Sequence, residues 1–319
     1  IHFFVKPNTL HILFYPKIVQ YKCNIFCRGT FLMKLIATDL DGTLLQPDST
    51  ISKYDLEWIN KAEESGIKVI VATGRQYTAA LELLSKSNFK PDYIITDNGS
   101  CAYSVKDNKK ICSYPIKEDT VKEILDFLES NNYPYGLSSD KHRIHFRDIS
   151  KRLTDEFNRN QSVIPDLDRN HLDSLVSFIE SDSALYVDSY KDILNLNTDL
   201  FNISALSFDP NRIKDGIAEA SKIKGVNVVS SAYNNFEFQS YETSKGKSLA
   251  FIADYLHISL DDTMAIGDNY NDVSMFEHAY HSVAMGNSND DIKNLCRYTT
   301  LTNLENGVGH AIKTFALNK

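Results

Sequence analysis

An apolar run that ends in two closely spaced carboxylates constrains most strongly what this chain can fold into. Leu35-Ile36-Ala37 predicts a buried strand, and Asp39-Leu40-Asp41-Gly42-Thr43 follows it at once. The glycine permits a sharp turn after the acids. Buried carboxylates are costly unless a cation or hydrogen-bond donors compensate them, and oxygen ligands favour a hard cation such as Mg²⁺. The pattern predicts a metal site, although an Asp-rich turn alone would also explain five residues.

Three later segments carry side chains that could complete such a site. Val69-Ile70-Val71-Ala72 is typical of a strand buried on both faces, and Thr73-Gly74-Arg75 after it offers a hydroxyl and an amide to a phosphate. Lys245 precedes a helical pattern, which places a cation beside a helix start, where anions are favoured. Met264-Ala265-Ile266 predicts another strand, and the acidic loop Gly267-Asp268-Asn269-Tyr270-Asn271-Asp272 follows it.

Each of these segments alone also fits a structural role, as a turn, a solvated lysine or a pair of helix-capping acids. Their common position at strand ends favours one shared site. Alternating strands and helices indicate an α/β fold with a mainly parallel sheet, and ligands bind at the carboxyl ends of such strands. We therefore expect the four segments to meet at one edge of the sheet.

Together the four segments resemble the motifs of the haloacid dehalogenase (HAD) superfamily, specifically its Cof-type phosphatases with a C2-type (C2B) cap. The resemblance runs from about Met33 to the end of the chain, and includes Asn98-Gly99 and the segment from Asn303 to Val308. It implies a Rossmann-like parallel sheet core with helices on both faces and an inserted α+β cap domain that covers the site.

The resemblance also implies a role for each motif residue. Asp39 would attack phosphorus and form an aspartyl-phosphate, while Asp41 would protonate the leaving oxygen and later accept a proton from water. Mg²⁺ would be held by Asp39, the backbone carbonyl of Asp41 and Asp268. The remaining residues would bind phosphate oxygens (Thr73, Gly74 and Asn271), neutralise charge (Lys245) and orient that lysine (Asp272). A phosphate monoester and Asp39 repel each other, so the cations are essential.

The sequence therefore predicts a Mg²⁺-dependent phosphatase that acts on small phosphorylated metabolites, with sugar phosphates favoured by the resemblance. The nearest alternative is a phosphomutase of the phosphomannomutase type, although Thr73-Gly74-Arg75 fits the phosphatase form better. A silent phosphate-binding regulatory protein is disfavoured, because nucleophile, acid/base and metal carboxylate are all present.

Composition limits the partners and the compartment. The formal net charge of -8 argues against nonspecific nucleic-acid binding, which needs a basic surface. No apolar stretch reaches the roughly 18 residues of a membrane span. The five cysteines are odd in number and scattered, which favours reduced thiols in a cytoplasmic setting: Cys23, Cys27, Cys101, Cys112 and Cys296. The oligomeric state is left open.

The long interval between Thr73 and Lys245 locates the insertion. We expect a catalytic core at residues 33–115 and 231–319, a cap at 116–230, and hinges near 114–118 and 230–235. Core helices are expected at 52–64, with Ser52 as N-cap, and at 77–85. Further helices in this interval are expected at 118–129 and 212–222, and strands at 203–208, 226–230 and 236–239.

Two basic segments have less certain roles. Residues 1–32 contain no Asp or Glu, a bias found in targeting segments, and an alternative is that the biological start is Met33. In the cap, a basic cluster could contact an anionic substrate, but a solvated loop is favoured: Lys141, His142, Arg143 and Arg147.

Overall fold

A computed structural model describes residues 33–140, 142–161, 164, 167–180, 184–231 and 234–318. The predictions for residues 1–32, for Cys23 and Cys27 within them, and for Lys141 lie outside this range.

The chain forms two sheets, and the larger one carries the predicted motifs. In the described part of the chain it has eight strands in the order β14-β13-β12-β1-β2-β3-β4-β5. Their bounds are Leu35–Thr38 (β1), Lys68–Ala72 (β2), Tyr93–Thr96 (β3), Cys101–Ser104 (β4), Lys109–Ser113 (β5), Thr263–Gly267 (β12), His281–Ala284 (β13) and Tyr298–Thr299 (β14). The strands from β14 to β3 pair in parallel, whereas β4 and β5 pair antiparallel. The predicted parallel sheet is confirmed, with an antiparallel extension that was not predicted.

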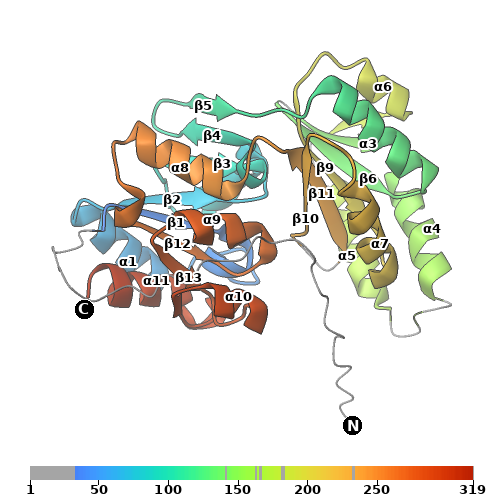
Figure 1. The fold of residues 1–319 in the computed structure, drawn as a ribbon. Coiled ribbons are helices and arrows are strands. Elements are labelled where there is room, and N and C mark those ends of the chain that lie inside the picture. Colours follow the sequence, from blue (N-terminus) through green and yellow to red (C-terminus); the bar gives the residue numbers. More distant parts are fainter. Residues whose placement is uncertain are drawn as a thin grey trace, which may run out of the picture. The chain divides into compact units, whose positions relative to one another are not determined.

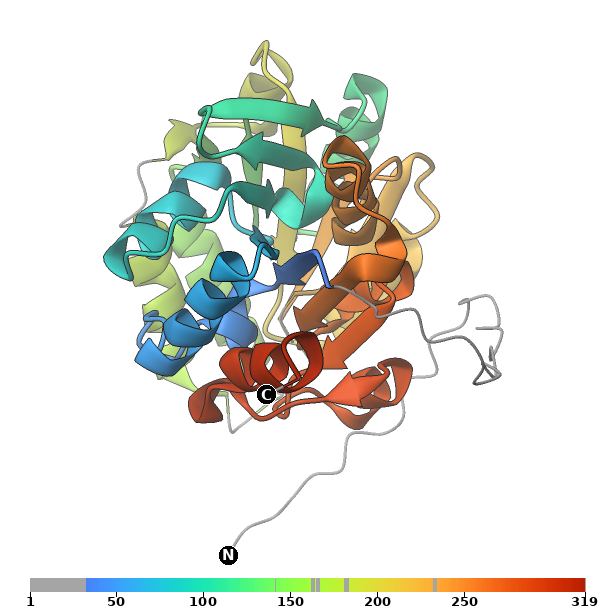
Figure 2. The same ribbon diagram turned by 90° about the vertical axis from the view of Figure 1, so that its left-hand side faces the viewer.

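Side chains alternate between the two faces of this sheet, and both faces are covered. Ile36 of β1 packs with the helices of one face, while Leu35 and Ala37 pack on the other. Figures 1 and 2 show α1 beside α11, and α8 beside α9. The helices that flank this sheet are Lys53–Glu64 (α1), Tyr77–Lys86 (α2), Lys245–Tyr255 (α8), Val273–His278 (α9), Asp290–Leu295 (α10) and Gly307–Ala311 (α11). This is the expected α/β core with helices on both faces.

The smaller sheet belongs to the insertion. Its strand order among the described residues is β10-β11-β9-β6-β7-β8, mostly antiparallel, with β7 and β8 parallel. The strands are Tyr135–Ser139 (β6), Arg143–Phe146 (β7), Leu185–Val187 (β8), Leu200–Leu206 (β9), Val226–Val229 (β10) and Asn235–Ser240 (β11). The helices are Glu118–Ser130 (α3), Ile149–Gln161 (α4), Arg169–Glu180 (α5), Tyr190–Leu194 (α6) and Pro210–Ala220 (α7). We call the segment from α3 to β11 the cap domain.

The chain passes from the larger sheet to the cap domain between β5 and α3, and returns between β11 and α8. Hydrogen bonds hold both connections. The amide of Ile116 donates to Leu200 O at 2.8 Å in the first, and Thr243 Oγ1 donates to Gly99 O in the second. Because β11 pairs with β9, we propose that the cap extends to Ser240 rather than ending at residue 230. The rest of the predicted domain division stays a prediction.

Most predicted elements are present, with shifted ends. α1 begins after Ser52, whose Oγ accepts from the amide of Asp55 at 2.9 Å, as predicted for an N-cap. The helix expected at 212–222 is α7, which begins two residues earlier because Pro210 occupies its first turn. The strand expected at 203–208 is β9, which spans Leu200–Leu206.

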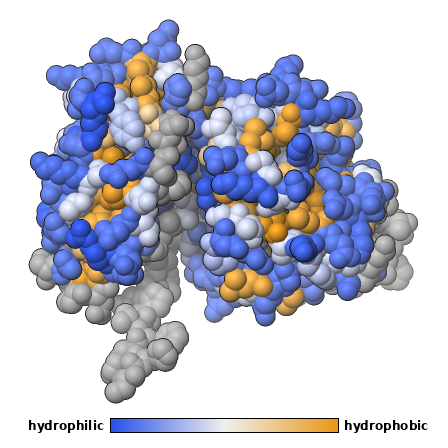
Figure 3. Space-filling model, turned by 180° about the vertical axis from the view of Figure 1, so that it is seen from behind, coloured by the Kyte–Doolittle hydropathy of each residue, from blue (hydrophilic) through white to orange (hydrophobic). Residues whose placement is uncertain are grey.

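Among the described residues, no helix combines the length and the apolar character that crossing a membrane requires. The face shown in Figure 3 is mostly hydrophilic, and its hydrophobic residues form scattered patches. The apolar side chains that define the fold are instead gathered in three buried clusters, one in the cap domain and one on each face of the larger sheet.

The carboxylate of Asp55 ties α1 to α11, and its loss is expected to destabilise the protein. Asp55 is 1% exposed, and its Oδ1 accepts from the amide of Gly309 at 2.6 Å. Asp55→Ala leaves that amide buried without an acceptor, which costs about 1–3 kcal/mol of the free energy of unfolding. Asp55→Asn keeps an oxygen at this place and should cost less. Urea unfolding of the two variants checks this, and equal losses would contradict it.

Candidate active site

The ends of three adjacent strands bring the predicted motifs together. β1 lies between β12 and β2, all parallel, so their carboxyl ends share one edge of the sheet. Asp39 follows β1 and is 5% exposed, and its amide donates to Ile266 O at 2.8 Å. Thr73 follows β2 and Asp268 follows β12. The predicted convergence of these segments is present in the structure.

The turn after Asp39 requires a glycine. Gly42 has φ +78°, and a Cβ at this position would lie 2.6 Å from Asp268 Oδ2. Thr43, the next residue, is buried and donates from Oγ1 to Asp268 Oδ1 at 3.0 Å. The Asp-x-Asp-Gly-Thr segment, which follows β1, thus holds the carboxylate of Asp268, which follows the neighbouring strand β12.

Lys245 lies buried between two carboxylates. Its Nζ donates to Asp39 Oδ1 at 2.6 Å and to Asp272 Oδ1 at 2.7 Å, and its side chain is 0% exposed. The other oxygen of Asp272 accepts from the amides of Asp268, at 2.9 Å, and Asn269, at 3.1 Å. Asp272 therefore binds both the lysine and the amides of the acidic loop, and its role in orienting Lys245 stays a prediction.

The charges in this cluster do not balance. Burial raises the pKa of Asp39 well above its ordinary value; the charges of Asp272, Asp268 and Asp41 add to this, and Lys245 opposes it. Burial also raises the pKa of Asp268 to about 7, reinforced by the charges of Asp272 and Asp41. Burial alone would lower the pKa of Lys245, but the two adjacent carboxylates outweigh it and raise the pKa. The ammonium of Lys245 therefore stays charged. It does not by itself compensate the negative charges of Asp39, Asp268 and Asp272.

This donor set fits a hard divalent cation. Carboxylate oxygens of Asp39, Asp268 and Asp272 lie within 4.8 Å of one another. Since the oxygens of Asp272 already accept from Lys245 and two amides, Asp39 and Asp268 are the carboxylates best able to bind a metal. Oxygen ligands and few protein contacts suit Mg²⁺. The part assigned to the backbone carbonyl of Asp41 stays a prediction.

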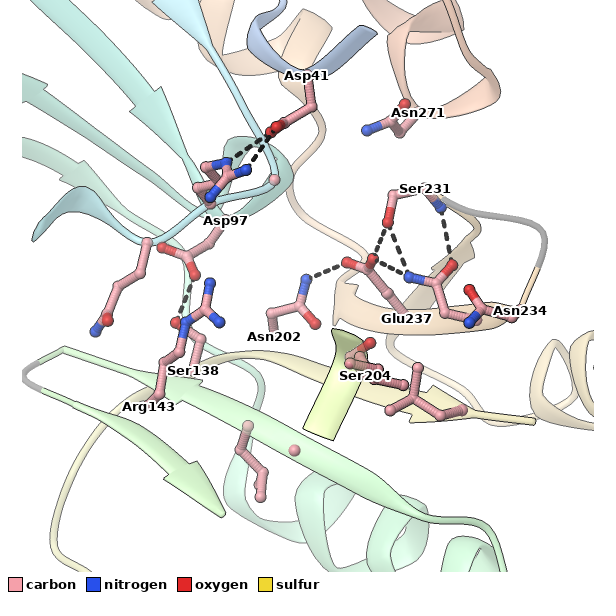
Figure 4. Close-up of a pocket in the computed structure, with 18 of the residues that line it drawn as sticks. Asp41, Asp97, Ser138, Arg143, Asn202, Ser204, Ser231, Asn234, Glu237 and Asn271 are labelled. Carbon is pink, nitrogen blue, oxygen red and sulfur yellow. Dashed lines mark hydrogen bonds and ion pairs between the residues drawn. The ribbon is translucent and has the colours of Figure 1, made fainter. Parts of the chain in front are cut away.

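Asp41, which is labelled in Figure 4, is half-exposed and forms two hydrogen bonds with Arg75. Arg75 Nε donates to Asp41 Oδ2 at 2.7 Å, and the terminal nitrogen Nη2 donates to Oδ1 at 2.6 Å. This two-point contact suits an ionised carboxylate. The structure places Arg75 on the pocket wall, bound to the predicted acid/base.

Of the three residues predicted to bind phosphate, Gly74 and Asn271 line the pocket. Thr73 is buried behind it, and its Oγ1 accepts from the amide of Arg75 at 3.1 Å. Asn271 Nδ2 donates to Asn98 Oδ1 at 3.1 Å. A Cβ at position 74 would lie 3.0 Å from the same Asn98 oxygen, so a larger residue there would require the Asn98 side chain to shift.

The pocket has a volume of about 480 Å³. It is lined by the cap domain and by the loops that follow β1, β2, β3 and β12, which we call the catalytic edge. The larger sheet contributes Asp39, Asp41, Asp268 and Asn271. The cap domain contributes a polar group, which includes Arg143, Asn202, Ser204, Asn234 and Glu237 (Figure 4), and an apolar group of Leu137, Ile149, Leu175, Ile179 and Leu206.

Sequence reasoning missed most of the cap side of the pocket. Arg143 lies on its wall, whereas His142 and Arg147 of the same basic cluster are exposed, so a solvated loop describes only part of the cluster. Glu237 and Asn202 were not singled out. The available signal was the alternation of Asn235, Glu237 and Gln239 with aromatic residues in one predicted strand.

A Rossmann-like sheet whose motif-bearing loops meet at one edge, beneath an inserted cap, defines the class of HAD-like hydrolases. This chain belongs to that family, because the family model described as haloacid dehalogenase-like hydrolase matches residues 36–312. The resemblance to the HAD superfamily noted in the sequence is therefore confirmed, and the C2B type of the cap stays a prediction.

Individual relatives agree with this assignment. Phosphatase YwpJ of Bacillus subtilis (strain 168) is 34% identical over 285 residues, covering 88% of this chain and 99% of the relative. The 5-amino-6-(5-phospho-D-ribitylamino)uracil phosphatase YwtE of the same organism is 30% identical over 281 residues, covering 88% and 97%. A solved haloacid dehalogenase-like hydrolase from B. subtilis has 33% identity and a TM-score of 0.77, covering 89% of this chain and all of that one. The predicted enzyme class, phosphoric monoester hydrolase, agrees with both phosphatase names.

The buried Asp97 makes stability depend on pH. Asp97 follows β3, is 2% exposed and accepts from Ser138 Oγ of the cap domain at 2.5 Å. Burial raises its pKa from 3.8 to about 6. The folded protein then binds this proton more tightly than the unfolded chain does, so this contribution to stability falls as pH rises from about 4 to about 6.

Asp97→Asn removes that titration while keeping an oxygen for Ser138, and asparagine tolerates the φ of 49° at this position. We expect the free energy of unfolding of the variant, relative to the wild type, to increase by on the order of 1 kcal/mol between pH 4.5 and pH 7.5. Urea unfolding at the two pH values measures this, and an unchanged difference would contradict it.

Proposed function

We propose that this protein hydrolyses small phosphomonoesters, with Mg²⁺, through a phosphoryl intermediate on Asp39. The observation that carries the proposal is the buried Lys245 between Asp39 and Asp272, with Asp268 close by at the floor of the pocket. A nucleophilic carboxylate must approach a dianionic phosphate, and a fixed ammonium reduces that repulsion.

The chain's own residues and one water molecule account for each proton and electron pair of the reaction. Lys245 binds Oδ1 of Asp39, which leaves Oδ2 to attack phosphorus as the bond to the leaving oxygen breaks. Asp41, when protonated, gives its proton to that oxygen. Water then attacks the phosphoryl group, Asp41 accepts the proton, and Asp39 is regenerated. The pair of hydrogen bonds from Arg75 matches the ionised Asp41, the form that this second step needs.

Asp39, Asp268 and the backbone carbonyl of Asp41 would hold Mg²⁺ in this proposal. When bound, the ion supplies positive charge beside the transferring phosphoryl group. Gly74 and Asn271, which line the pocket, would donate to phosphate oxygens in this proposal. Thr73, which is buried behind the pocket wall, would contribute its hydroxyl to phosphate binding.

The cap side of the pocket would contact the leaving group of the substrate. Arg143, Asn202, Ser204 and Asn234 offer hydrogen bonds to hydroxyl groups, as the favoured sugar phosphates require. The aliphatic group that includes Ile149, Leu175 and Leu206 offers an apolar surface beside them. A hydroxylated chain or ring with one apolar face would match both, and the phosphoribitylamino-uracil in the name of YwtE has such a composition.

A panel of phosphomonoesters, with Mg²⁺ supplied and free phosphate measured, tests the proposal. Phosphate release from sugar phosphates or related metabolites is the expected result. Conversion of hexose phosphates into isomers without phosphate release would favour the phosphomutase instead. Binding of many esters, with neither release nor isomerisation, would favour a silent phosphate-binding protein.

Removal of the divalent cation is expected to abolish phosphate release. Asp39 and Asp268 would then face the substrate with too little positive charge, since Lys245 is the nearest ammonium among the described contacts of Asp39. The measurement is the rate with excess chelator, followed by addition of Mg²⁺, which should restore it. Full activity in chelator would contradict the metal assignment.

Asp39→Asn is expected to lower kcat by roughly 10³-fold or more, because an amide oxygen is a poor nucleophile. Asp48→Asn makes the same chemical change at an exposed aspartate outside the site and should leave kcat close to the wild-type value. Retained activity in Asp39→Asn, in a folded variant, would refute the assignment of the nucleophile.

The remaining parts of the proposal concern compartment and partners. Cys101, Cys112 and Cys296 are free thiols in the described part of the chain, which supports the reducing, cytoplasmic setting inferred from the sequence. The partner we propose is a small phosphorylated metabolite, and neither nucleic acid nor membrane is invoked.

A further inference from the structure

Glu237 of β11 is a buried carboxylate that the reaction scheme does not use. It is 6% exposed and lies on the pocket wall, on the cap side (Figure 4). Buried carboxylates need donors, and the identity of those donors indicates what the residue can do.

Four donors from both domains surround this side chain. Its Oε2 accepts from Asn98 Nδ2 at 2.8 Å and from Asn202 Nδ2 at 2.6 Å. Its Oε1 accepts from Asn235 Nδ2 at 2.8 Å and from Ser231 Oγ. Because a carboxylate offers about four acceptor positions, these bonds saturate it. Glu237 thus has no position left for a substrate hydroxyl, and any effect on the reaction must pass through its neighbours.

Asn98 is the neighbour that leads to the phosphate end of the pocket. An ionised carboxylate only accepts hydrogen bonds, so Asn98 must turn its NH₂ group toward Glu237. Its Oδ1 then faces the other way, where it accepts from Asn271 Nδ2 at 3.1 Å. Asn98 is 1% exposed and packs against Gly74, so its amide has little room to rotate. With one N–H held by Asn98, Asn271 has its other N–H for a phosphate oxygen.

A second connection reaches the same acidic loop. Ser231, which donates to Glu237, accepts with its backbone oxygen from Asn269 Nδ2 at 3.1 Å. The loop that carries Asp268 and Asn271 is therefore joined to Glu237 on both sides. These hydrogen bonds join the cap domain to the loops at the strand ends of the larger sheet. They can therefore form only while the cap domain lies against those loops.

We propose that Glu237 is a positioning residue: its negative charge fixes the amide orientation of Asn98, and through it that of Asn271, so that the phosphate site is complete only while the cap domain contacts the catalytic edge. The inference rests on the proposed function, because it takes Asn271 as a phosphate ligand. It adds that a cap residue that does not touch the substrate controls phosphate affinity.

Binding of inorganic phosphate to the full chain with Mg²⁺ tests this without turnover. The dissociation constant follows from the rise of the unfolding midpoint with phosphate concentration. Glu237→Ala should weaken phosphate binding roughly tenfold, the equivalent of about one lost hydrogen bond to a charged group. Glu242→Ala, at an exposed glutamate just after β11, is the matched control and should leave binding unchanged.

A double-mutant cycle separates positioning from a general structural effect. In an Asn271→Ala background, Glu237→Ala should change phosphate binding by less than about twofold, because the route through Asn271 is already removed. An equal loss in both backgrounds, or no loss in either, would overturn the inference. If Glu237→Ala does not fold, Asn98→Gly replaces it in the same cycle, since the φ of 54° at Asn98 suits glycine.

The two proposals fail in different ways. A wild-type protein that neither binds phosphate nor releases it from any ester refutes the proposed function and removes the basis of the inference. A wild-type protein that releases phosphate, but whose cycle is additive, refutes only the role of Glu237.

Discussion

The buried ammonium of Lys245 is the contact on which the rest of the site depends. Without it, Asp39 and Asp272 would be two buried like charges, which is costly to maintain. Its Nζ is held by these two carboxylates, and helix packing fixes the backbone that carries it. Lys245 is the first residue of α8, Ser244 caps that helix, and a Cβ at Gly246 would lie 1.9 Å from Ser274 O of α9. The close approach of two helices thus places one cation within hydrogen-bond distance of the nucleophile.

Charge and shape are divided between the two domains. The larger sheet supplies the acidic cluster, in which burial, reinforced by the neighbouring carboxylates, raises the pKa of Asp39 and of Asp268. A divalent ion bound there would favour the ionised acids. The cap domain supplies the polar and apolar walls that would surround a leaving group. Direct hydrogen bonds join the two, from Gln76 to Ser139, from Ser138 to Asp97 and from Asn98 to Glu237. The catalytic edge and the cap side of the pocket are therefore joined by direct hydrogen bonds.

The sequence predicted three of the four segments at this edge because each follows a short apolar run, and parallel strands must end at the same edge. Lys245 was singled out instead by its place before a helical pattern. It could not predict the cap wall. Alternation along β11 sets Phe236 and Phe238 apart from Asn235, Glu237 and Gln239, and a polar strand face normally faces water. All of these residues are buried, because the other domain covers that face. Arg143 shows the same limit, since only tertiary packing distinguishes it from the exposed His142. The left-handed backbone of Asn98, with a φ of 54°, could likewise not be predicted from the periodicity of hydrophobic residues.

Only two connections, from β5 to α3 and from β11 to α8, join the cap domain to the rest of the described chain. Mutation and selection could therefore change this one continuous stretch of sequence, and with it one wall of the pocket, without altering the acidic cluster. The contact between Asn98 and Glu237 limits this freedom. A replacement cap would have to bring its own acceptor to Asn98, so descendants with new specificities are expected to keep an oxygen at that one place.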